Sequence, residues 1–205
     1  WRSFELPALA IWRLEFIPRL CKNLNRELMI KQITNDTLKP IVLNYRYTTD
    51  SAYEIAVSKV KSATWNFKLT LVALPSAVVK ASTSTLFDPV VENPLNFKFS
   101  QDGRDIAYLQ LGYQSWNRRM RIWDLLIDDD FRRSGIGSQL MDLAKVEARK
   151  VGARMLVLET QSCNVPAINF YLQHGFELIG FDLAHYTNND IERNEFRMEF
   201  GFEIA

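Results

Sequence analysis

Arg132-Arg133-Ser134-Gly135-Ile136-Gly137 stands between the end of a predicted strand and the start of a predicted helix. The N–H groups of a first helical turn have no intrahelical acceptor, and the helix dipole is positive at this end. Two glycines let an anion approach the backbone closely, and two arginines add positive charge. The stretch therefore predicts an anion site suited to a pyrophosphate, with a tight turn and solvated arginines as the alternative.

Two common nucleotide-binding motifs do not match this loop. A Walker A motif requires Lys and then Ser or Thr after the second glycine, whereas Ser138-Gln139 follows here. A dinucleotide fingerprint requires Gly or Ala three residues further on, where Leu140 stands. A pyrophosphate bound at this loop would therefore belong to another kind of ligand.

The elements around the loop are clearest in the second half of the chain. Asp102-Gly103 predicts a hairpin between strands at 97–100 and 105–113, and a third antiparallel strand covers 120–127. The helix after the glycines ends at Gly152 and leads to a buried strand at 155–159, which we expect to lie parallel to 120–127. A helix over 165–173, capped by Asn164, precedes strands at 176–186 and 195–203.

The first half of the chain has weaker patterns. Ala52, Ile55 and Ala56 have helical spacing, which predicts a short helix over 49–60. Alternation predicts strands at 29–33 and 67–74. Residues 81–94 contain Ser, Thr and two prolines and predict a surface loop, the best candidate for contact with a substrate.

The order of elements predicts an α+β fold. Its central sheet is mostly antiparallel, has one parallel step splayed at a β-bulge, and carries helices on both faces. Residues 29–205 form a single domain in this interpretation, with a cofactor-binding core at about 97–202. Residues 1–28 are an N-terminal extension, and two origins stay open for it: an amphipathic arm, or a segment upstream of the natural start.

Composition limits the class of protein. The chain has 205 residues, 47% of them hydrophobic and 24% charged, which is typical of one globular domain. The net charge of +1 predicts neither a nucleic-acid partner nor a membrane surface. Two cysteines and two histidines without metal-ligand spacing predict no disulfide framework and no metal, and so a cytoplasmic protein.

Two motifs together resemble the GNAT superfamily of N-acetyltransferases. The family's cofactor loop follows Gln/Arg-x-x-Gly-x-Gly/Ala, which Arg132, Gly135 and Gly137 match. Its Asn-x-x-Ala-x-x-x-Tyr motif matches Asn164, Ala167 and Tyr171. The stretches 158–164 and 186–188 look most like the streptothricin acetyltransferases. Asp129 and Arg133 depart from the usual Pro and Gly, and we expect the carboxylates of 128–130 to point outward.

The resemblance implies acetyl-CoA as co-substrate. Its pantetheine arm would pair with a strand bulged near 125–127, and an N–H group of that strand would stabilise the oxyanion. The predicted cofactor contacts are Leu125, Leu126, Ile127, Arg132, Arg133, Ser134, Gly135, Ile136, Gly137, Ser138, Asn164 and Tyr171. Asn164 has a helix cap as its alternative role.

The resemblance also implies a proton donor and a base. Tyr171 is the predicted acid, with a core tyrosine as the alternative reading. Glu159 is the predicted base, Asp124 is its competitor, and a structural carboxylate is the alternative for Glu159.

The predicted substrate is a small cationic amine such as a streptothricin-like or aminoglycoside-like antibiotic. Carboxylates near the predicted cleft favour a cation. Acetylation of protein N-termini or lysines, and a non-catalytic acyl-CoA-binding domain, stay open as alternatives. A homodimer stays open as well.

Overall fold

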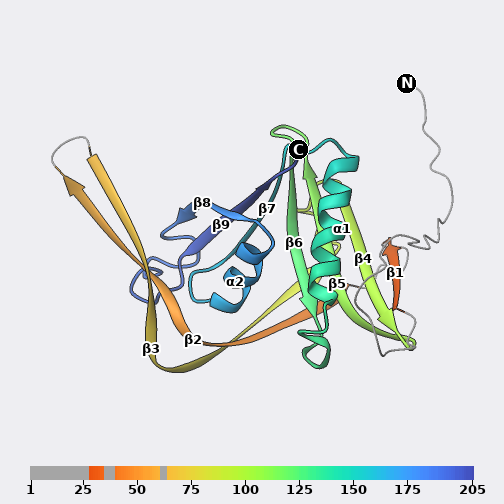
Figure 1. Cartoon of the computed structure of the whole chain (residues 1–205), viewed down its shortest axis with the longest axis horizontal. Helices are drawn as coiled ribbons and strands as arrows, with labels where there is room; N and C mark the ends of the chain where they lie inside the picture. Colours follow the sequence, from red (N-terminus) through yellow and green to blue (C-terminus); the bar gives the residue numbers. More distant parts are fainter. Residues whose placement is uncertain (1–27, 35–39, 61–63) are drawn as a thin grey trace.

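The computed structural model describes residues 28–34, 40–60 and 64–205, and the predicted extension lies outside them except for Leu28. Their strands form a seven-stranded sheet in the order β1-β4-β5-β6-β7-β9-β8 and a two-stranded sheet of β2 and β3 (Figure 1). The elements are β1 Leu28–Ile33, β2 Ile41–Val60, β3 Thr64–Leu86, β4 Pro94–Gln101, β5 Arg104–Gln114, β6 Arg119–Ile127, α1 Ile136–Lys150, β7 Met155–Gln161, α2 Val165–Gln173, β8 Glu177–Asp182 and β9 Arg197–Glu203.

The second half of the chain folds largely as its sequence predicts, although β8 ends at Asp182 and not at 186. β4, β5 and β6 form an antiparallel meander, and Asp102 and Gly103 turn its first hairpin with φ angles of 52° and 79°. β6 and β7 are parallel neighbours connected through α1, whereas the other neighbouring strands of this sheet are antiparallel. The α+β, GNAT-like fold class with one parallel step is confirmed.

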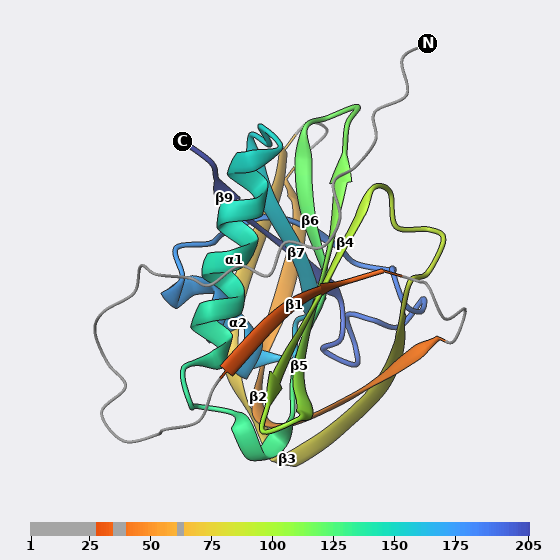
Figure 2. The ribbon, with the colours of Figure 1, turned by 90° about the vertical axis from the view of Figure 1, so that its right-hand side faces the viewer.

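Both α-helices of the described residues lie on one face of the sheet (Figure 2). The Nζ of Lys145 in α1 donates to the carbonyl of His174 just after α2, which holds the helices side by side. The opposite face carries the base of the β2–β3 hairpin and the segment after it, where Tyr45 contacts Asp124. The sequence had placed helices on both faces, and here a hairpin covers the second face instead.

The predicted helix over 49–60 is wrong, because these residues belong to β2. Tyr53, Ile55 and Val57 face Leu71, Leu69 and Phe67 across an antiparallel ladder. The same residues fit both a helical and an alternating spacing, and pairing with a distant strand decides between them.

The predicted loop over 81–94 is only partly right. Residues 81–86 continue β3, and the strand predicted at 67–74 is part of that same element. Ser84 and Thr85 pair with Leu43 and Val42, so hydroxyl side chains here occupy strand positions. The loop is confined to residues 87–93.

One hydrophobic core joins α1 to the sheet. Leu140, Met141, Ala144 and Ala148 of α1 are fully buried, and they pack with the apolar residues of the central strands. No helix of the described residues is long and apolar enough to cross a membrane.

We predict that Leu140→Ala destabilises the fold by about 2–5 kcal/mol, because it leaves a cavity where the side chain is 0% exposed. Chemical denaturation measures this free energy of unfolding. Val146→Ala on the same helix removes a side chain that is 44% exposed and is expected to change it by no more than about 0.5 kcal/mol. Equal effects of the two variants would contradict this packing.

Candidate active site

The glycine loop presents the start of α1. Gly135 is the N-cap residue with φ of 87°, and α1 begins at Ile136 without a side-chain cap. The first intrahelical bond runs from the N–H of Gln139 to the carbonyl of Gly135. The N–H groups of residues 136–138 precede that bond and therefore have no acceptor within the helix. They form the donor set that an anionic group requires.

Gly137 has a packing role. A Cβ atom there would lie 3.1 Å from the Phe170 ring of α2 and 3.2 Å from Cδ1 of Ile127. A Cβ atom at this position would therefore require the Phe170 ring or the Ile127 side chain to shift slightly. Gly135 supplies the turn, and Gly137 supplies the close approach of the two helices.

The acidic run before the loop is paired with arginines. Arg104 pairs with Asp128 and, over 3.8 Å, with Asp130. Arg132 pairs with Asp129 over 2.8 Å and donates to the carbonyl of Arg46 in β2 over 2.8 Å. These carboxylates are thus neutralised on the outer side of the loop. The hydrogen bond to Arg46 connects Arg132, and with it the loop, to β2. Arg133, the other arginine of the loop, forms no ion pair within the described residues.

The sheet opens beside this loop. β6 and β7 pair only from Arg119–Met155 to Arg121–Val157, although both strands continue. Gln110 of β5 faces Asp124, whereas Leu111 faces Ile122, so Trp123 is the extra residue of a β-bulge in β6. The bulge lies two residues earlier than the predicted 125–127, and the strands diverge from there.

Alternation along β6 decides which backbone groups face the opening. The N–H of Asp128 donates to Ile106 of β5, so the even-numbered residues of this segment point their backbone groups toward β5. Leu125 and Ile127 then direct theirs into the gap, and the Ile127 carbonyl accepts from Nε of Arg132 there. The backbone of Leu126, also predicted as a cofactor contact, belongs to the β5 ladder instead.

Asp124 is a buried carboxylate at the opening. It is 5% exposed and accepts from the hydroxyl of Tyr45 over 2.9 Å. Ser84 also donates to it, and Gln110 donates over 3.1 Å in the amide orientation that satisfies its neighbours. Burial raises the pKa of Asp124 and Asp88 adds to this, against the hydrogen bonds from Ser84 and Tyr45. Among the described residues, no group that shifts this pKa is a cation.

Tyr171 lies on α2 among aromatic side chains. Its ring is 6.2 Å from the rings of both Phe176 and Phe200, centroid to centroid. Burial raises the pKa of Tyr171 to about 12, so its hydroxyl stays protonated at neutral pH. Tyr171 also acts on the pKa of Tyr45, which places the two phenols near each other.

Glu159 is held in a charged cluster away from Asp124. Its carboxylate pairs with Arg121 over 2.8 Å and with Arg197 over 2.5 Å. Glu199 shares both arginines. Because both arginines engage this carboxylate, the structure favours a structural role for Glu159.

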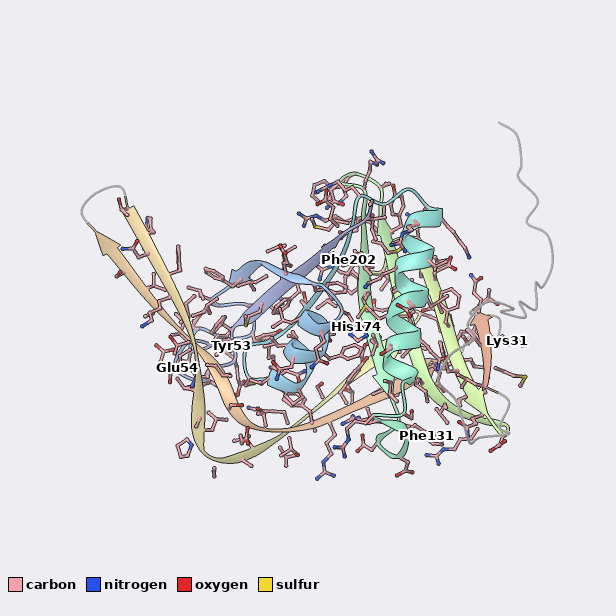
Figure 3. All side chains as sticks on the ribbon, viewed as in Figure 1. Lys31, Tyr53, Glu54, Phe131, His174 and Phe202 are labelled. Atoms are coloured by element: carbon pink, nitrogen blue, oxygen red, sulfur yellow. The ribbon has the colours of Figure 1, made fainter. Side chains whose placement is uncertain are left out.

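Asn164 caps α2, which is the alternative role that the sequence predicted for it. Its side-chain oxygen accepts from the N–H of Ala167 over 3.4 Å, since Pro166 has no N–H to offer. His174, just after the same helix, contacts the hydroxyl of Ser138 over 3.1 Å and so connects α2 to the first turn of α1 (Figure 3). Cys163 is buried against Tyr47, and burial raises the pKa of its thiol, which does not favour a nucleophile.

Sequence reasoning missed Tyr45, Ser84 and Gln110. All three contact Asp124, and two of them come from the hairpin that was read as a helix and a loop. The alternation in Tyr45-Arg46-Tyr47 is the one sequence signal that both tyrosines share a strand face. No group of three or more His, Cys, Asp or Glu among the described residues can hold a metal ion.

A free helix start next to two splayed parallel strands is the arrangement expected of the GNAT class. The profile of the acetyltransferase (GNAT) family matches residues 83–176. The matched segment, a little under half of the chain, therefore corresponds to a GNAT acetyltransferase domain.

Streptothricin acetyltransferases are among the relatives of the chain. The Streptomyces lavendulae enzyme is 39% identical over 91 residues, which cover 44% of this chain and 48% of that protein. The Bacillus subtilis streptothricin acetyltransferase A is 34% identical over 74 residues, 36% of this chain and 43% of that protein. The matches therefore span about half the length of these curated relatives.

A solved structure extends the similarity to the fold of most of the chain. A crystal structure of nourseothricin acetyltransferase aligns with a TM-score of 0.69 at 26% identity, over 87% of this chain and 99% of that one. A Bacillus anthracis protein assigned as a streptothricin acetyltransferase and crystallised with acetyl coenzyme A aligns at 0.66 and 22% identity, over 87% and 98%. The second similarity concerns the fold alone.

The φ angle of 59° at Arg133 yields a prediction, because this left-handed conformation favours glycine. We expect Arg133→Gly to be more stable than Arg133→Ala by about 1 kcal/mol in thermal or chemical unfolding. Both variants remove the same charge, so their difference reports the backbone alone. An alanine variant at least as stable as the glycine variant would contradict the observed conformation.

Proposed function

We propose that the chain transfers an acetyl group from acetyl-CoA to a primary amine of a cationic small molecule, such as a streptothricin-like or aminoglycoside-like antibiotic. The similarity to streptothricin acetyltransferases supports this substrate class. The observation that carries the proposal is the end of β6–β7 pairing at Arg121–Val157, with Asp124 and Leu125 directly after it.

The residues present fit acetyl-CoA. Free N–H groups at residues 136–138 suit its pyrophosphate, and Arg133 adds a charge that no carboxylate neutralises among the described residues. The backbone of Leu125 and Ile127 faces the gap and suits the amides of the pantetheine arm. The bound co-substrate supplies an activated acetyl thioester. Arg132 holds the loop on β2, and Asn164 caps α2, so we assign both residues supporting roles.

We assign each catalytic role to a group that lies at the opening between β6 and β7. A backbone N–H that β6 points into the gap is our oxyanion donor, and the N–H of Leu125 also lies against the hydroxyl oxygen of Tyr45. Tyr171 is our proton donor to the leaving thiolate, since its phenol stays protonated at neutral pH. Asp124 is our base in place of Glu159, because it is buried and lacks a cationic partner among the described residues.

Asp124 also explains why a cationic amine fits. A buried carboxylate surrounded by neutral donors gains from an incoming ammonium group, which supplies the opposite charge that the protein does not. Because the pKa of Asp124 is raised, it lies closer to the pKa of the substrate amine. Asp124 therefore accepts the proton of the ammonium group more readily before the amine attacks.

A second candidate is acetylation of protein N-termini. The Escherichia coli ribosomal protein bS18-alanine N-acetyltransferase is 28% identical over 99 residues, 48% of this chain and 66% of that protein. The loop that was expected to read a peptide is short here, because residues 81–86 lie in β3. This observation favours the small-molecule substrate.

The proposal is tested by thiol release from acetyl-CoA with the purified chain and three acceptors. These are streptothricin, an aminoglycoside and a peptide with a free N-terminal alanine. We expect turnover with at least one antibiotic and none with the peptide. Turnover on the peptide alone would contradict a small-molecule substrate and support protein acetylation. Acetyl-CoA binding in calorimetry without any thiol release would indicate a non-catalytic domain.

We predict that Asp124→Asn and Tyr171→Phe each lower kcat by about 100-fold or more, the usual contribution of a general base or acid. Glu159→Gln, which keeps the shape of a paired carboxylate, is expected to cost less than ~10-fold. The pKa of Asp124 is raised, so kcat/KM of the wild type falls on acidification through a pKa above the ordinary aspartate value. A larger loss in Glu159→Gln than in Asp124→Asn would reverse the assignment.

A further inference from the structure

One strand of the hairpin bridges the two strands that diverge. The hydroxyl of Tyr45 in β2 donates to Asp124 of β6, and the hydroxyl of Tyr47 donates to Gln161 of β7, each over 2.9 Å. Tyr45 and Tyr47 are two residues apart, so they share one face of β2. β2 therefore crosses the opening and contacts both of its edges.

Tyr45 reaches the reacting end of the opening. Its oxygen lies against both the Asp124 carboxylate and the backbone of Leu125, and it is close enough to Tyr171 for the two phenols to interact. Burial and the Asp124 charge raise the pKa of Tyr45 far above that of a free phenol. It is therefore a permanent hydrogen-bond donor at any working pH.

We propose that Tyr45 is a positioning residue for Asp124, and that the β2–β3 hairpin thereby completes the catalytic centre. This inference rests on the proposed function, in which Asp124 is the base. Tyr45 donates to Oδ1, and Gln110 donates to Oδ2 from the sheet. Two donors on two different oxygens fix the plane of the carboxylate and so the direction from which an ammonium group reaches it.

The same hydrogen bond sets the protonation state of Asp124. A donor stabilises the charged carboxylate and opposes the effect of burial. The groups that face Asp124 are Tyr45 from β2, Ser84 from β3, Gln110 from β5 and Asp88 from the 87–93 loop, and Asp88 opposes ionisation. Tyr171 from α2 acts on this set through Tyr45. Without the Tyr45 hydroxyl, Asp124 holds its proton to higher pH.

The test compares pH profiles of kcat/KM for the wild type, Tyr45→Phe and Tyr47→Phe, with acetyl-CoA and the antibiotic that the panel identifies. A hydrogen bond to a charged group corresponds to a shift of about 1–2 pH units, so the acid limb of Tyr45→Phe is expected to move up by this amount. Tyr47→Phe loses a hydrogen bond of the same length on the same strand but none to Asp124, and its acid limb stays in place.

A double variant separates positioning from an independent effect. If Tyr45 acts through Asp124, Tyr45→Phe lowers kcat no further in an Asp124→Asn background. Unchanged acetyl-CoA affinity in calorimetry checks that each variant is folded.

An unshifted acid limb, or losses that multiply in the double variant, overturns the role of Tyr45 while the base assignment stands. Full activity of Asp124→Asn overturns the base assignment and this inference together.

Discussion

The structure depends on the loss of pairing between two parallel strands in the middle of the sheet. β6 and β7 are hydrogen-bonded neighbours only up to Arg121 and Val157, and the bulge at Trp123 turns β6 away. Backbone groups inside a sheet are costly to leave unpaired, so the gap needs a partner. The start of α1 lies at the end of β6, which gives one ligand both a set of amide donors and an open strand edge.

Local signals made the cofactor side of this arrangement predictable. Gly135 must adopt a left-handed φ, and Asn164 must reach past Pro166 to Ala167, and both requirements are visible in the sequence. The Asp102-Gly103 turn and the parallel step also follow from short patterns. These features involve residues a few positions apart, where sterics and hydrogen bonding decide the conformation without help from the rest of the fold.

The surroundings of Asp124, where the amine substrate would bind, were not predictable in the same way. Tyr45 meets Asp124 across 79 positions of sequence, and the residues after it suit a helix as well as a strand. The position of the bulge was also misjudged by two residues, because it depends on the register between β5 and β6 rather than on the sequence of β6 alone. Short sequence patterns carry no information about contacts between distant segments.

The two candidate bases show why residue type alone cannot assign chemistry. Asp124 and Glu159 stand on the two strands that diverge, and both are acidic. Arg121 and Arg197 pair with Glu159, whereas Asp124 receives only neutral donors among the described residues. Burial without a nearby cation raises the pKa of a carboxylate such as Asp124. The difference arises from β9, which brings Arg197 to Glu159, and from the hairpin, which shields Asp124 from water. The same divergence of strands therefore leaves one carboxylate in a cluster of arginines and the other buried among neutral donors.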